Sequence, residues 1–157
     1  MTVHRISHAA VVVVALLLLA CASRPPVPDW ALEAQSASER AVKAYLQGHV
    51  RVAEVEWRKA LTEASATGQP NQMARLALLQ CAAQVAALEF TGCPQYQRYA
   101  AGAEPAERAY ARYLQVQHTA QDVALLPMAQ QATAAQLLKG QSVPWVPAAE
   151  AALSQLT

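Results

Sequence analysis

The feature that most constrains the fold is a series of alanine- and leucine-rich segments of helical length, separated by short breaks that contain glycine or proline. Alanine, leucine, glutamine, glutamate and arginine are frequent in these segments, and all are good helix formers. No segment shows the alternation of β-branched and polar residues that is typical of a half-buried strand. The sequence therefore predicts an all-α fold of stacked antiparallel helical hairpins.

Glycines end several of the expected helices, with Gly48, Gly68 and Gly140 as the clearest stops. A glycine just after the last turn is a common helix stop, because it adopts the left-handed conformation without steric strain. The expected helices cover residues 30–47, 50–67, 71–90, 105–117, 122–139 and 148–156.

Three residues near these helix ends have more specific expected roles. Asp29 is expected to cap the N-terminus of the first helix, since its carboxylate can accept hydrogen bonds from free backbone N–H groups. Pro127 either kinks the fifth helix or marks a later start for it. Trp145, between two prolines, either docks the C-terminal tail on the bundle or contacts a partner.

The N-terminus is typical of an export signal. Residues 9–20 form a continuous apolar stretch after Arg5, and a stretch of roughly a dozen residues has the length of a signal-peptide core. A transmembrane anchor is the alternative, but it needs about 20 apolar residues and would have to bury Arg24 and the prolines around it. Residues 1–20 are therefore predicted to be a cleaved signal peptide.

The end of this stretch, Leu18-Leu19-Ala20-Cys21, resembles the lipobox of bacterial lipoproteins. The resemblance implies that the Cys21 thiol receives a diacylglycerol, that the signal is cut before Cys21, and that the new amino group is acylated. Several acyl chains on one residue make a stable membrane anchor. Ala22 is not aspartate, and by the family's sorting rule this implies the outer membrane of a Gram-negative cell, with the protein facing the periplasm. Residues 21–28, rich in proline, would then form an extended tether.

Two further cysteines remain once Cys21 is assigned to lipid, and the exported location allows a disulfide. Cys81 lies inside the expected third helix, whereas Cys93 follows the break after it. The two can pair only if the chain turns straight back along that helix. The alternative is two separately buried thiols.

Residues 44–61 resemble the tetratricopeptide helical hairpin, in the spacing of Gly48, Ala53, Trp57 and Ala60. The resemblance implies that the glycine permits the turn, that the alanines let two helices approach closely, and that the tryptophan fills the wedge between them. Residues 39–47 also match residues 107–115 at six of nine positions, an offset of 68, which is twice the repeat of about 34 residues in this family. Residues 29–157 are thus expected to form one tetratricopeptide-like domain, with an ordinary helical bundle as the alternative.

No catalytic or metal-binding pattern stands out in the sequence. His49 and His118 lack neighbours at metal-ligand spacing, and Glu54 and Glu56 point to different faces of a helix. The part after residue 20 carries eleven basic residues (twelve less Arg5) and eleven acidic ones, so it has no charge pattern that favours nucleic acid. We therefore expect a protein that is not an enzyme and that has no metal or cofactor.

Three tyrosines are the candidate contact residues. Tyr45, Tyr110 and Tyr113 lie where the tetratricopeptide resemblance implies a peptide-binding groove, although core packing is the alternative role. The sequence favours a lipid-anchored scaffold that binds a protein partner, in envelope assembly or secretion, and the alternative is a carrier of an apolar ligand. An exposed groove with polar side chains would favour the scaffold, and a closed apolar cavity of roughly a few hundred Å³ would favour the carrier.

Overall fold

The computed structural model describes residues 27–141, so the signal peptide, Cys21, Trp145 and the expected last helix lie outside the described residues. Within this range every regular element is a helix, and the predicted all-α fold is confirmed. The elements are α2 (Asp29–Leu46), α3 (Val50–Ser65), α4 (Pro70–Ala86), α5 (Pro94–Tyr99), the 3₁₀ turn η1 (Ala100–Gly102), α6 (Pro105–Leu114), α7 (Ala120–Val123) and α8 (Met128–Leu138).

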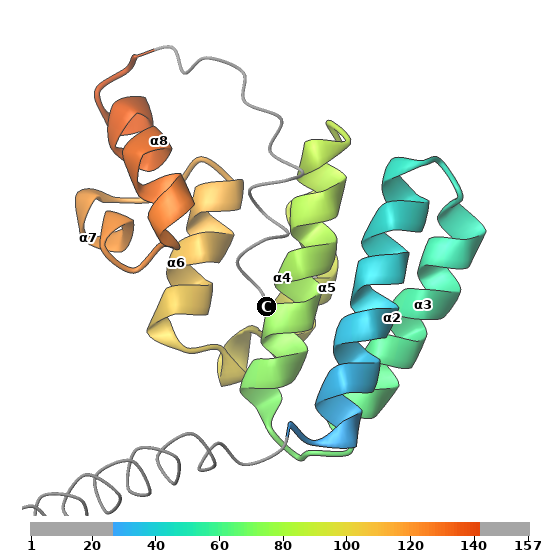
Figure 1. Ribbon diagram of the computed structural model, residues 1–157. Helices are drawn as coiled ribbons and strands as arrows, with labels where there is room; N and C mark the ends of the chain where they lie inside the picture. Colours follow the sequence, from blue (N-terminus) through green and yellow to red (C-terminus); the bar gives the residue numbers. More distant parts are fainter. Residues whose placement is uncertain (1–26, 142–157) are drawn as a thin grey trace, which may run out of the picture.

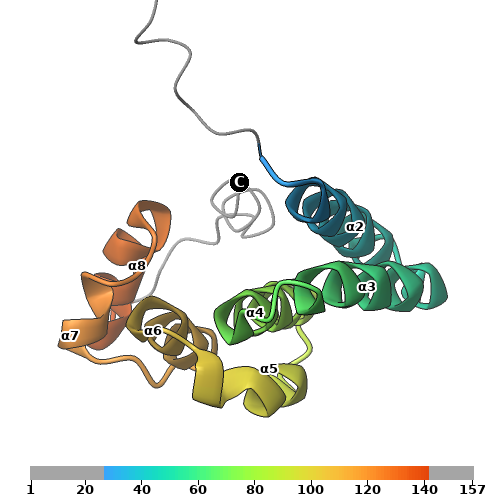
Figure 2. The same cartoon turned by 90° about the horizontal axis from the view of Figure 1, so that it is seen from below.

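Successive helices pack side by side as antiparallel hairpins (Figure 1). Helices α2 and α3 form the first hairpin, α4 lies against both of them, and α6 lies against the other side of α4. Seen along the helix axes, α2 and α8 lie on one side of the α4–α6 pair and α5 lies on the opposite side (Figure 2).

Three clusters of buried side chains hold these helices together, and alanine is the commonest residue in them. Ala41 of α2, Ala53 and Ala60 of α3, and Ala74 of α4 are at most 1% exposed. Alanine at such positions lets helix backbones approach closely. The alanine-rich composition thus specifies a closely packed helical stack.

Two expected helix ends are wrong by three or four residues. Helix α4 ends at Ala86 instead of residue 90, and α6 ends at Leu114 instead of residue 117. In each case the chain takes the left-handed conformation two residues later, at Leu88 (φ 63°) and Val116 (φ 56°). Neither residue type signals a stop, so the sequence suggested continuation.

The start of α2 and the region after α4 also differ from expectation. Asp29 is the first residue of α2, and the N-cap position belongs to Pro28. Asp29 still lies in the first turn, where the positive end of the helix favours a carboxylate. Helix α5, which was not predicted from the sequence, begins at Pro94 directly after the left-handed Cys93.

Pro127 marks a helix start, as one of the two alternatives predicted. The expected helix over residues 122–139 is two elements, α7 and α8, and Pro127 is the N-cap of α8. A proline here has no N–H to lose within the first turn, so the break leaves no unsatisfied donor.

Candidate functional site: an apolar end face

The residues of the tetratricopeptide resemblance lie at the packing centre of the first hairpin. Gly48 occupies the left-handed position that ends α2 (φ 79°). Trp57 is 4% exposed and packs among alanines of α2 and α3 and against Leu79 of α4. Its indole Nε1 has no hydrogen-bond partner among the described residues. Trp57 therefore acts as the packing wedge between the first hairpin and α4.

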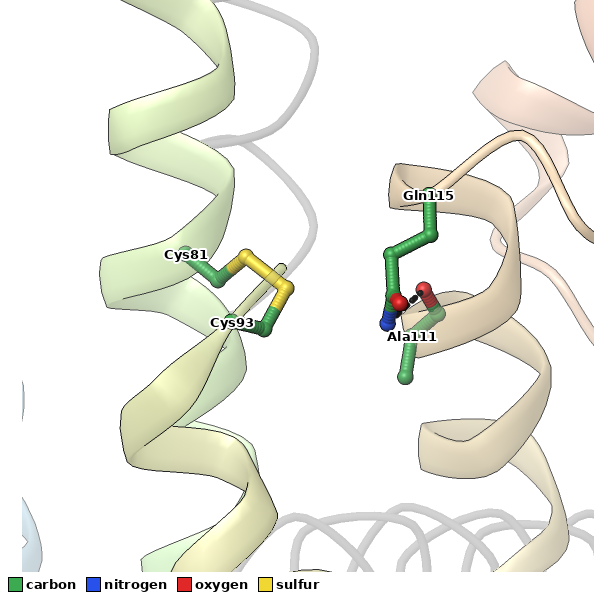
Figure 3. The surroundings of a disulfide bond; sticks show 4 residues. All are labelled: Cys81, Cys93, Ala111 and Gln115. Atoms are coloured by element: carbon green, nitrogen blue, oxygen red, sulfur yellow. Dashed lines mark hydrogen bonds between the residues drawn. A yellow bond between two sulfur atoms is a disulfide. The ribbon is translucent and has the colours of Figure 1, made fainter. Parts of the chain in front are cut away.

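Cys81 and Cys93 form a disulfide in the structure, with their Cα atoms 5.2 Å apart. The chain does turn straight back along α4, because α4 ends earlier than expected and Leu88 and Gly92 both take positive φ. Both cysteines are buried, in the same cluster as Leu78 and Tyr96. The bridge fixes the start of α5 against the middle of α4 (Figure 3).

The three candidate tyrosines pack against different clusters of buried side chains. Tyr45 packs against the cluster of the first hairpin, whereas Tyr110 and Tyr113 stack on each other with ring centroids 6.1 Å apart. Tyr113 also meets the ring of His118 edge to face, with centroids 5.4 Å apart. These contacts fit the alternative of core packing.

The pKa values of the tyrosines reflect this burial. Burial raises the pKa of Tyr110 to about 12, with a smaller contribution from Tyr113. Burial also raises the pKa of Tyr45 to about 12, helped by the nearby carboxylate of Glu89. Glu89 belongs to the turn after α4, so the end of α2 lies close to that turn.

Two buried polar side chains join the elements at the C-terminal end of the domain: Asp122 joins α7 to α6, and His118 joins the loop after α6 to α8. The Asp122 carboxylate accepts hydrogen bonds from Arg112 (Nε to Oδ2, 3.0 Å) and from the backbone N–H of Thr119 (2.8 Å). These partners, Arg112 first, hold the pKa of Asp122 well below its usual range. The buried His118 ring contacts the carbonyl of Ala134 through Nε2 at 3.0 Å. His118 Nδ1 has no hydrogen-bond partner among the described residues, whereas both oxygens of Asp122 are bonded.

Four helices end in the same backbone motif. The second residue after the end of each helix has a left-handed conformation. Its own N–H and the N–H of the next residue donate hydrogen bonds to carbonyls of the last turn. This Schellman motif usually places glycine at the left-handed position. Helices α2 and α8 follow the rule with Gly48 and Gly140, whereas α4 and α6 place Leu88 and Val116 there.

The internal repeat makes this difference clear. Ala41 and Ala109 are equivalent in the matched segments, and both are fully buried. At the next position after the match, Gly48 is replaced by Val116, although the backbone conformation is the same. A left-handed conformation costs an L-residue roughly 1–2 kcal/mol, and a β-branched residue there is a clear outlier.

Leu88 and Val116 belong to a group of exposed apolar residues at one end of the domain. We call this group the end face: Leu46, Val50, Leu88, Phe90 and Val116. The side chains of Leu88, Phe90 and Val116 are 76%, 73% and 69% exposed. The five residues of the end face lie at or beside the turns that follow α2, α4 and α6. Figure 1 shows all three turns at the same end of the domain, opposite the start of α2.

A hollow of about 240 Å³ opens in the end face. Phe90 and Val116 line it together with Val85, Leu114 and the two cysteines of the disulfide. Gln115 of α6 also lines the hollow, and its side-chain amide donates a hydrogen bond to the Ala111 carbonyl at 3.2 Å (Figure 3). The end face therefore combines protruding apolar side chains with a recess that apolar and glutamine side chains line.

Comparisons of the chain with protein-family models, with curated proteins and with solved structures give no match. Between residues 27 and 141, no three His, Cys, Asp or Glu side chains are grouped so that they could hold a metal ion. No helix in the same part is both long and apolar enough to span a bilayer.

The end face was not predicted from the sequence because its residues come from three separate turns. Leu88, Phe90 and Val116 were assigned to helix ends, where apolar residues are expected to be buried. The Thr91-Gly92 break was the one available signal, since it places Phe90 next to a turn.

Proposed function

We propose that this chain is a lipid-anchored, non-enzymatic scaffold that binds a protein partner through the end face, on the periplasmic side of the outer membrane. The observation that carries the proposal is the strained, exposed placement of Leu88 and Val116. Strain of this kind is retained where a surface needs a specific side chain, since glycine would relieve it. An exposed apolar patch with a recess is typical of a protein-binding surface.

The position of the end face agrees with an N-terminal anchor. Helix α2 has 18 residues and begins directly after the predicted tether, so its far end lies about 27 Å from the tether. Leu46 is at that far end. A lipid at Cys21 would hold the start of α2 towards the membrane, and the end face would then point into the periplasm.

The alternative of an apolar-ligand carrier finds less support. The hollow in the end face and a groove between α2 and α4 have volumes of about 240 and 270 Å³. Both are open to solvent, and glutamine side chains line both of them. A carrier would instead enclose its ligand within an apolar cavity.

Site-specific photocrosslinking in the native membrane tests the proposed function. A photoreactive phenylalanine analogue replaces Phe90, and the matched control replaces Ser65, which is exposed at the last turn of α3 on the opposite end. We expect a discrete protein adduct from position 90 and none from position 65. Lipid adducts alone, or equal protein adducts from both positions, would contradict the proposal.

The anchor has its own test. A Cys21→Ala variant is expected to leave the membrane fraction, because the acylated thiol is the proposed anchor. A variant that stays bound to membranes would contradict the anchor without affecting the end face.

A further inference from the structure

A second surface, distinct from the end face, is the groove of about 270 Å³ between α2 and α4. The α2 wall presents small residues, among them Ala31, Ala34 and Ser38, and Ala64 of α3 lies between the two walls. The Ser38 hydroxyl is already bonded to the Gln35 carbonyl at 2.8 Å. Small residues spaced three and four apart lie on one face of α2, so another helix can pack closely against that face.

The α4 wall is apolar with a single cation. Leu76 and Leu79 supply the apolar surface, and Arg75 stands beside them with its side chain 56% exposed. The Arg75 guanidinium lies 3.6 Å from Glu107 Oε1, while the other oxygen of Glu107 accepts the backbone N–H of Glu104 at 2.9 Å. Arg75 therefore retains N–H donors for a further carboxylate.

The residues that follow α8 in the sequence have matching chemistry. Residues 148–156 are expected to be helical, and in a helix Ala149, Ala152, Leu153 and Leu156 would share one face. Glu150 is the only charged side chain in residues 142–157. The segment thus combines one apolar stripe with one negative charge.

We propose that residues 142–157 bind intramolecularly in the groove between α2 and α4, with Leu153 against Leu76 and Glu150 paired with Arg75. The lengths agree, because a helix of nine residues is about 13 Å long and the α2 wall from Trp30 to Ser38 also has nine residues. Docking by an amphipathic helix in a groove of this kind follows a common mode of recognition.

The connection starts on the same side of the domain as α2. The described chain ends at Gln141, whose N–H bonds to the Gln136 carbonyl, and α8 lies on the same side of the α4–α6 pair as α2 (Figure 2). The six residues 142–147 can span about 20 Å when extended.

Intrachain photocrosslinking of the full chain tests this inference. A photoreactive leucine analogue is placed at residue 153, and the matched control is placed at Ser154, on the opposite face of the expected helix. Adducts are separated by size and the crosslinked peptides are identified by mass spectrometry. We expect the probe at 153 to give a monomeric adduct on peptides of α2 or α4, and the probe at 154 to give none.

A Leu76→Glu change provides the second arm. It removes apolar surface from the groove at a half-buried position, and we expect it to abolish the adduct from residue 153 while the helical circular dichroism is unchanged. A dimeric adduct would assign the groove to a second copy, and a lipid adduct would assign it to lipid. Either result, an adduct elsewhere in the chain, or no adduct at all would overturn the inference. None of these outcomes bears on the end face, which is probed at Phe90.

Discussion

Replacing Val116 by glycine should make the protein more stable, although it removes a side chain. Val116 occupies the left-handed position after α6, with φ at 56°. A left-handed conformation costs an L-residue about 1–2 kcal/mol, and because valine is β-branched we take the strain at Val116 as about 2 kcal/mol. Glycine relieves this strain and leaves the Schellman motif intact.

Two losses reduce the gain. Glycine adds about 0.5–1 kcal/mol of conformational entropy to the unfolded chain. The valine side chain is 69% exposed, so its removal gives up about 0.5 kcal/mol of apolar burial. The expected net increase in the free energy of unfolding is about 0.5–1 kcal/mol, which corresponds to a rise of about 2–4 °C in melting temperature.

The assay is equilibrium urea unfolding followed by circular dichroism, with the midpoint as the readout. The control is Val55→Gly, at an exposed position inside α3, where glycine should lower the free energy of unfolding by about 1 kcal/mol. A Val116→Asn variant checks whether relief of the strain stabilises the protein, since asparagine tolerates the left-handed conformation. Unlike glycine, asparagine does not add conformational entropy to the unfolded chain. If Val116→Gly destabilises the protein as much as Val55→Gly does, the strain argument is refuted.

Four further predictions follow from other parts of the structure. Gly102→Ala should lower the free energy of unfolding by about 1–3 kcal/mol in thermal melts, because a Cβ there would overlap the side chain of Pro70 and lie 3.2 Å from its backbone. Replacing both Cys81 and Cys93 by alanine should lower it by about 3 kcal/mol in urea titrations, the value expected for opening a loop of this size. Because the pKa of Asp122 is depressed in the folded state, its contribution to stability should be complete above about pH 4 and should be lost as the pH falls further; Asp122→Asn should remove that part of the acid dependence. Burial raises the pKa of Tyr110 to about 12, so stability should fall as the pH rises from about 10 towards that value, and Tyr110→Phe should lessen the fall.

The elements that the sequence predicted correctly are those whose residue types carry the signal. Gly48 and Gly140 identify two helix ends, because glycine is the residue that best fits the left-handed position. Pro127 identifies the start of α8 for a similar reason, since its ring suits a helix N-terminus. The alternation of such breaks with helix-forming segments is sufficient to predict an all-α stack.

The elements that it predicted wrongly depend on tertiary structure. Leu88 and Val116 have no intrinsic preference for the left-handed conformation, so only the surrounding packing can impose it. Helix α5 is six residues long and is held by a disulfide to α4, which a helix propensity cannot reveal. The end face escaped prediction because its members meet only when three distant turns are brought together.

The most direct test of the account measures the photocrosslink from position 90 in a Leu88→Gly, Val116→Gly background. If the proposal is right, leucine and valine are retained at these two strained positions because their side chains contact the partner. It therefore predicts a protein that melts at a higher temperature than the parent chain and that no longer forms the protein adduct at position 90. An undiminished adduct in the stabilised double variant would contradict the claim that the end face binds the partner through these side chains.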